Sequence, residues 1–88
     1  MNTEKQELVE WLKDLIDCLY NERKMSKAEV ELVFKKANTV FYNMFHQTVY
    51  QALNNPKLKK LIKPATDFPP EFVISQMYQS VVCDIIWG

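Results

Sequence analysis

The sequence predicts an all-α protein, a small helical bundle of three to four helices with one long central helix. Three observations predict this class. Apolar side chains recur at spacings of three and four residues over most of the chain, capping signatures precede two of these stretches, and prolines delimit the others. A chain of 88 residues is long enough for one domain only, so residues 1–88 are expected to form a single helical unit.

The first helix is predicted to begin near Glu4 and to end at about Asn21. Thr3 and Gln6 have the spacing of a capping box, in which the threonine oxygen accepts a hydrogen bond from an early backbone N–H. Leucines recur at helical spacing along one face, at Leu8, Leu12, Leu15 and Leu19. A row of acids lies on another side and is typical of a solvated face: Glu7, Glu10, Asp14 and Asp17.

A long second helix is predicted from Ser26 to about Asn54. Ser26 and Glu29 form a capping box, and Met25 and Val30 are placed for a hydrophobic staple. Neither Gly nor Pro interrupts the segment, which would be about 40 Å long. Its second half is apolar or aromatic around most of its circumference, at Val40, Phe41, Tyr42, Met44, Phe45, Val49, Tyr50 and Leu53. Such a helix is normally covered on several sides.

Two further helices are predicted toward the C-terminus. Asn55 and Pro56 suit the N-cap and first position of a short helix that Pro64 stops. After a turn that ends at Pro70, an apolar helix runs to the end of the chain. The first and last helices are expected to pack against the long one. A bundle of this size buries too little to cover every apolar residue, so an oligomer or an obligate partner is expected.

Composition and charge restrict the partners. Eleven basic residues balance eleven acidic ones, so no long-range field draws the chain as a whole to a polyanion or a membrane. Cys18 and Cys83 are too few for a disulfide framework and are expected to be reduced thiols. The N-terminal residues lack the pattern of a signal peptide, and no uncharged segment is suited to span a bilayer. We therefore expect a cytoplasmic protein with no membrane partner.

Catalytic chemistry is not expected. A cysteine nucleophile needs a base and an orienting group, and His46 is the only histidine in the sequence. Two cysteines and one histidine, at Cys18, His46 and Cys83, match no zinc-ligand spacing. The sequence therefore predicts a protein that is not an enzyme, with no metal and no cofactor.

Aromatic residues provide the main candidate binding site. Tyr42, His46 and Tyr50 follow one another at i, i+4 spacing, and Trp11 and Trp87 lie elsewhere in the chain. These rings could form a partner- or ligand-binding surface, because aromatic side chains offer a large contact area with little entropy loss. The alternative is ordinary core packing, with His46 at an interface rather than acting as a ligand contact or proton sensor.

A small basic patch surrounds the predicted short helix, at Lys57, Lys59, Lys60 and Lys63. It could contact phosphate or an acidic partner surface. Arg23 is the only arginine, whereas phosphate clamping and base readout favour arginine, so nucleic acid is not the expected partner.

Three segments in order, LYNERKMS, FYNMFHQTVYQAL and FPPEFVISQMYQSVVCDIIWG, give the chain a pattern that resembles the effector-binding and dimerisation domain of TetR-like repressors. The helix-turn-helix segment that precedes this domain in the family has no match here. The resemblance implies a helical domain that dimerises through its last helices and holds a small apolar ligand beside the long helix, without promoter binding of its own.

The sequence thus favours a non-catalytic regulatory or interaction protein that docks an aromatic-rich helical surface on a protein partner, which includes a second copy of itself. The alternative is a sensor that encloses a small apolar ligand, with Tyr42, His46 or Tyr50 as polar contacts. DNA binding by a dimer through its lysines is the least favoured hypothesis.

Overall fold

A computed structural model describes the backbone of residues 3–88 and the side chains of residues 4–88. Within this range the chain forms five α-helices and one 3-10 turn, with no strand, so the all-α prediction is confirmed. The elements are α1 (Thr3–Asn21), α2 (Lys27–Phe45), α3 (Val49–Leu53), α4 (Pro56–Ile62), the 3-10 turn η1 (Lys63–Ala65) and α5 (Pro70–Trp87). The capping box predicted for Thr3 lies outside the described side chains.

Local capping sets the start of α2 and of α4 as the sequence predicts. The Glu29 N–H donates to Ser26 Oγ at 3.2 Å, and Glu29 Oε1 accepts from the Ser26 N–H at 3.1 Å. These two hydrogen bonds satisfy backbone donors that a helix start leaves free, and they lower the pKa of Glu29. Asn55 caps α4 by accepting from the N–H groups of Lys57 and Leu58, with Pro56 at the first helical position.

The long helix predicted from Ser26 to Asn54 is wrong, because α2 ends at Phe45. His46 adopts the left-handed conformation, with φ 58°, and its N–H donates to the Tyr42 carbonyl. Thr48 then starts α3 with a second capping box, in which Gln51 N–H donates to Thr48 Oγ1 and Thr48 N–H donates to Gln51 Oε1. This local capping competes with continuation of the helix, so the chain turns at residues 46–48.

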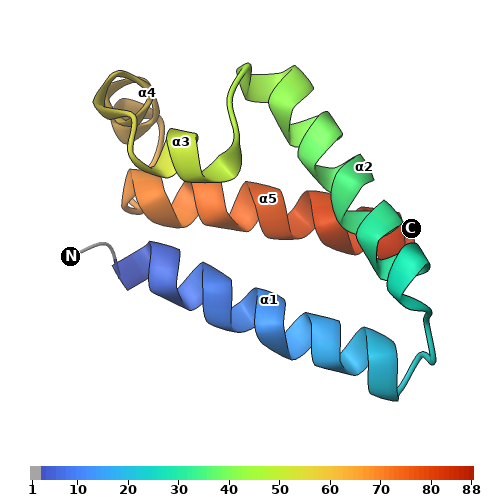
Figure 1. Cartoon of the computed structure of the whole chain (residues 1–88). Coiled ribbons are helices and arrows are strands. Elements are labelled where there is room, and N and C mark those ends of the chain that lie inside the picture. The colour runs from blue at the N-terminus through green and yellow to red at the C-terminus, as the bar shows by residue number, and fades with distance from the viewer. Residues whose placement is uncertain (1–2) are drawn as a thin grey trace.

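The helix at the centre of the fold is therefore α5 rather than a helix spanning residues 27–54. Figure 1 shows α5 running between α1 on one side and α3 and α4 on the other, while α2 crosses its C-terminal part. Within residues 3–88, α5 contacts each of the other four α-helices. The physical reason is its sequence, since a helix that is apolar around most of its circumference is normally covered on several sides, and here only the side of Gln76, Ser80 and Asp84 stays exposed.

The core joins all these helices through the buried face of α5. Its largest fully enclosed side chains are Leu8, Leu19, Phe41, Leu53, Ile74 and Val82. Tyr78 of α5 is 4% exposed and packs edge-on against Phe41 of α2, with 5.7 Å between ring centroids. Its hydroxyl donates to Asn38 Oδ1 at 2.6 Å, so the one polar end of this ring is satisfied at the core boundary.

Burial of Tyr78 predicts a specific alkaline sensitivity. Burial, followed by the nearby Tyr50, raises the pKa of the Tyr78 phenol from 10 to about 12. Because the unfolded chain ionises first, the stability that the neutral phenol supplies is complete below pH 10 and is lost as the pH rises to about 12. We expect the wild type to lose up to about 2–3 kcal/mol more than Tyr78→Phe across this window. Urea unfolding at a series of pH values measures the difference, and parallel curves for the two proteins would contradict it.

Candidate functional site

The outward side of α2 carries apolar side chains that the chain does not cover. One narrow face of this helix is buried through Val30, Val33, Ala37 and Phe41. On other sides, large apolar and aromatic residues are about half exposed to solvent: Leu32, Val40, Tyr42 and Met44. Leu32, Val40 and Met44 belong to a row spaced by four residues, so they follow one another along the helix.

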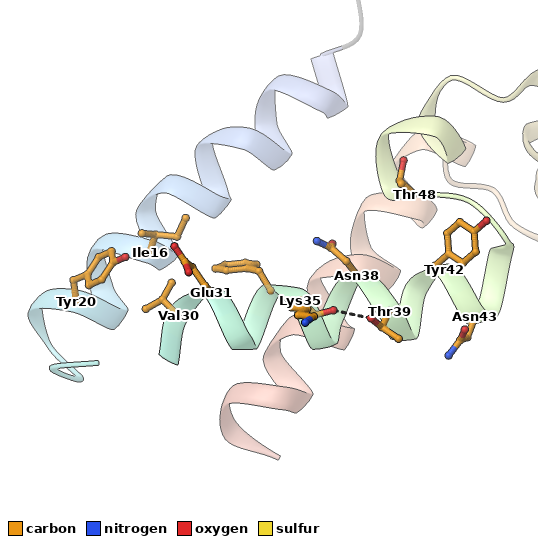
Figure 2. A pocket seen from close by; sticks show the side chains of 11 residues that line it. Ile16, Tyr20, Val30, Glu31, Lys35, Asn38, Thr39, Tyr42, Asn43 and Thr48 are labelled. Carbon is orange, nitrogen blue, oxygen red and sulfur yellow. Dashed lines mark hydrogen bonds between the residues drawn. The ribbon is translucent and has the colours of Figure 1, made fainter. Parts of the chain in front are cut away.

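A groove between α1 and α2 lies on one side of this surface. This α1–α2 groove has a volume of about 720 Å³ and is open to solvent along its length. Figure 2 shows Ile16 and Tyr20 of α1 beside Val30 at one end, and Tyr42 and Thr48 at the other. Its lining is mainly apolar, and Asn38 contributes an amide whose oxygen is already bonded to the Tyr78 hydroxyl.

A second groove lies between α2 and the C-terminal part of α5. This α2–α5 groove has a volume of about 410 Å³, and its apolar lining comes from Leu32, Val40 and Ile85. Its charged residues are the two cations Lys35 and Lys36. Lys35 and Thr39 line both grooves and form the ridge between them, which we call the α2 ridge. Thr39 Oγ1 donates to the Lys35 carbonyl at 2.9 Å, so this hydroxyl is occupied within the helix (Figure 2).

The break at residues 46–48 separates the three aromatic site residues predicted as one row. Tyr42 lines the α1–α2 groove, whereas His46 and Tyr50 line a different groove, of about 660 Å³, along α3. All three are exposed, at 52% for Tyr42 and 37% for Tyr50. The predicted spacing assumed one continuous helix, so it placed them together where the structure does not.

The groove along α3 is lined by amides that the fold already uses. Asn55 Nδ2 donates to Gln47 Oε1 at 3.1 Å, and Gln47 Nε2 donates to the Phe45 carbonyl at 3.3 Å. Gln51 is occupied in the capping box with Thr48, and Asn54 Nδ2 donates to the Tyr50 carbonyl. These bonds close the turn between α2, α3 and α4. They account for the amide side chains of this groove, Gln47, Gln51, Asn54 and Asn55, as parts of the fold.

The two tryptophans take different positions. Trp11 is partly buried and packs against the core. Trp87 is exposed at the end of α5, with the Arg23 guanidinium 5.7 Å from its ring centroid, so it ties the α1–α2 connection to the C-terminal helix. Tyr50 has a similar contact, with Lys5 Nζ 5.6 Å from its ring centroid.

The basic patch predicted around α4 divides into a bound lysine and three exposed ones. Lys59 Nζ lies 3.0 Å from Glu71 Oε1 on α5, and this hydrogen bond lowers the pKa of the Glu71 carboxyl. Lys57, Lys60 and Lys63 are exposed. The ion pair therefore fixes α4 on α5 and directs the remaining lysines to solvent.

Potential metal ligands and thiols are dispersed over the described part of the chain. No cluster of three or more His, Cys, Asp or Glu side chains among residues 4–88 could hold a metal ion. Cys18 and Cys83 are free thiols, and Cys18 Sγ donates to Glu22 Oε2 at 3.4 Å, a bond that raises its pKa. No helix within residues 3–88 has both the length and the hydropathy needed to cross a bilayer.

The fold and this surface define a small all-α protein in which one helix is covered on only part of its circumference. Comparison with known proteins found no matching family model, no similar curated protein and no similar solved structure. The site must therefore be interpreted from its own residues.

Sequence reasoning missed several residues that line the grooves. Leu32 is not among the residues that the sequence analysis singled out, and it lies on the side of α2 opposite Val30. The signal that could have identified it is its spacing of eight residues from Val40 and twelve from Met44, on a side with no core residue. Ile16 and Tyr20 line this groove because α1 packs beside α2, so no local sequence pattern predicts their part in it.

The left-handed backbone conformation of His46 predicts that a glycine at this position increases the stability of the protein. A side chain at φ 58° is sterically disfavoured by about 1–2 kcal/mol, and glycine removes this cost while adding freedom to the unfolded chain. We expect His46→Gly to raise the free energy of unfolding by roughly 0.5–1 kcal/mol. Lys36→Gly, an exposed position inside α2, is the matched control and should lower it by a similar amount. Chemical denaturation measures both, and a less stable His46→Gly protein would show that the imidazole makes a stabilising contact.

Proposed function

We propose that this protein is a non-catalytic regulatory or interaction protein of the cytoplasm that binds a protein partner through the α2 ridge and its flanking grooves. The observation that carries the proposal is the exposure of Leu32, Val40 and Met44 along one helix. Apolar side chains grouped in this way provide anchors for a partner, because burying them removes apolar surface from water. The free thiols Cys18 and Cys83 suit a reducing compartment.

The positive charge of the α2–α5 groove favours a different protein as the partner, rather than a second copy of this chain bound at the same groove. Two copies joined by a twofold axis through the α2–α5 groove would bring Lys35 and Lys36 toward the same residues of the other copy. Like charges across an interface oppose binding. A partner with apolar side chains beside acidic ones fits the groove better. Self-association through another surface remains part of the proposal, and sedimentation of the purified chain tests it.

A variant of two exposed anchors tests the docking function. We expect Leu32→Ser combined with Val40→Ser to weaken capture of the native partner at least tenfold, because truncating a central interface residue typically costs more than 1 kcal/mol. Both side chains are substantially exposed in the protein alone, so thermal unfolding should change little. Quantitative affinity capture from cells that naturally make the protein provides the measurement.

Leu61→Ser is the matched control, since Leu61 is more exposed than either residue and lies on α4. It should capture the partner like the wild type. The proposal is wrong if the double variant retains the same proteins at the same level, or if the control loses them equally.

A second candidate function is a sensor for a small apolar ligand, which the resemblance to the TetR-like effector-binding domain implies. The size of the α1–α2 groove supports this alternative, because about 720 Å³ lies within the range of small-molecule sites. Its apolar lining with Asn38 and Tyr42 at the edge also suits such a ligand.

The two functions predict different thermal behaviour. A sensor should be stabilised by an apolar ligand at concentrations above its dissociation constant, with a rise in melting temperature that Tyr42→Ala reduces. Leu61→Ser should respond like the wild type. A panel of apolar compounds screened by thermal unfolding gives the result, and equal shifts in the wild type and Tyr42→Ala would place the ligand outside the α1–α2 groove.

A further inference from the structure

A second apolar surface lies at the end of the molecule that α4 and the connection to α5 form. Leu61 is 77% exposed and Phe68 is 60% exposed, the two highest values among large apolar residues of the described chain. Figure 1 places α4 beside the start of α5, away from the C-terminal part that α2 crosses. We call Leu61, Phe68 and the exposed lysines Lys57, Lys60 and Lys63 the basic tip.

Local charge at the basic tip is positive although the whole chain is neutral. Lys57, Lys60 and Lys63 are exposed and form no ion pair with the side chains of residues 4–88, whereas Lys59 is paired with Glu71. Asp67 is the acid in the connection between α4 and α5. Glu4 and Glu7 at the start of α1 are further acids toward this end: burial, Glu7 and then Glu71 raise the pKa of Glu4, so its carboxyl lies within electrostatic range of the start of α5. Figure 1 places α1 on the opposite side of α5 from α4, so the three exposed lysines are on the α4 side of this end.

The two apolar side chains are held outward by the packing of their neighbours. Leu58 and Ile62 of α4 pack against the core, and the ion pair of Lys59 with Glu71 fixes the same side of the helix. Leu61 therefore points away from the protein. Phe68 stacks on Phe72 with 5.3 Å between ring centroids, and its N–H donates to Thr66 Oγ1. Both apolar groups are therefore positioned before any partner binds.

We propose that the basic tip binds the surface of an anionic phospholipid membrane. Leu61 and Phe68 enter the interface between head groups, and Lys57, Lys60 and Lys63 contact the phosphate and carboxylate groups of the lipids. Each lysine near such a surface strengthens binding by about fivefold, so the contact is reversible and sensitive to salt.

A lipid surface fits this tip better than a nucleic acid does. Leu61 has no group that hydrogen-bonds to a phosphate or a base, and one face of the Phe68 ring is already covered by Phe72. The cations are lysines, which act as point charges rather than as bidentate clamps. Exposed apolar side chains at the same end of the molecule as exposed lysines are the combination that interfacial membrane binding uses.

From the sequence no membrane partner is expected, because charge averaged over the whole chain is zero and no uncharged segment is suited to span a bilayer. Contact of one end of the molecule with a membrane surface requires neither a net positive charge nor a spanning helix. The basic tip shares no residue with the α2 ridge, so the two proposals succeed or fail separately.

Co-sedimentation of the full chain with lipid vesicles tests the proposal. The protein should bind vesicles that contain about 30% phosphatidylserine, and should leave vesicles of phosphatidylcholine alone in the supernatant. Binding should fall steeply as salt rises from low to physiological concentration and beyond. Leu61→Ser with Phe68→Ser should weaken binding at least tenfold, and Lys57→Glu with Lys60→Glu should abolish it.

Leu32→Ser with Val40→Ser is the matched control, since it removes exposed apolar side chains from α2 and should bind the vesicles like the wild type. Circular dichroism establishes that each variant retains its helices, and the lysine variant tests the proposal if the apolar one does not fold. Absence of binding by the wild type overturns the proposal. So does equal binding by Leu61→Ser with Phe68→Ser, or equal affinity for duplex DNA, because charge alone would then explain the contact.

Discussion

The fold depends on one constraint: α5 is apolar around most of its circumference, and only the side of Gln76, Ser80 and Asp84 stays exposed. The other four α-helices cover the rest of α5, since each of them contacts it. The turn at residues 46–48 is part of the solution, because it directs α3 and α4 back along the first half of α5 (Figure 1). A continuous helix from Ser26 to Asn54 would have carried those apolar residues past the core. The contact of Tyr78 with Phe41 and Asn38 then joins α2 to the second half of α5.

Sequence patterns predicted the elements better than their arrangement. The starts of α2, α4 and α5 follow from Ser26 with Glu29, Asn55 with Pro56, and Pro70. Each of these signals acts within one turn, through side-chain hydrogen bonds at α2 and α4 and through the fixed φ of proline at α5. The break after Phe45 also has a local signal, the capping-box spacing of Thr48 and Gln51, which the prediction of a continuous helix from the absence of Gly and Pro did not use. The central position of α5 could be inferred only by comparing whole helices, since α5 is the more apolar of the two and has a single exposed polar side at Gln76, Ser80 and Asp84.

The candidate site was predicted in part. Tyr42, His46 and Tyr50 are exposed, in agreement with the expectation that the fold leaves part of this stretch uncovered. Their predicted common face, however, required one continuous helix through residue 46, and α2 ends at Phe45. Pairing of Lys59 with Glu71 depends on how α4 lies on α5, and the grooves beside α2 depend on where α1 and α5 pack. The ion pair and the grooves therefore depend on tertiary packing. Periodicity in one segment carries no information about them, because it fixes only which residues share a side of that segment.

Single exposed apolar residues are normal on protein surfaces, so grouping decides which of them need explanation. Trp87 is exposed, yet it has a contact within the fold, since it lies against Arg23, whereas the exposed Tyr20 lines the α1–α2 groove. Leu32 and Val40 line one groove together with Lys35 and Lys36. Leu61 and Phe68 lie at the same end of the molecule as three exposed lysines. A serine at Leu32 or Leu61 would cost the fold little, since these side chains gain little from burial. Their apolar character is therefore unexplained by folding, and contact with another surface is the physical role that it can serve.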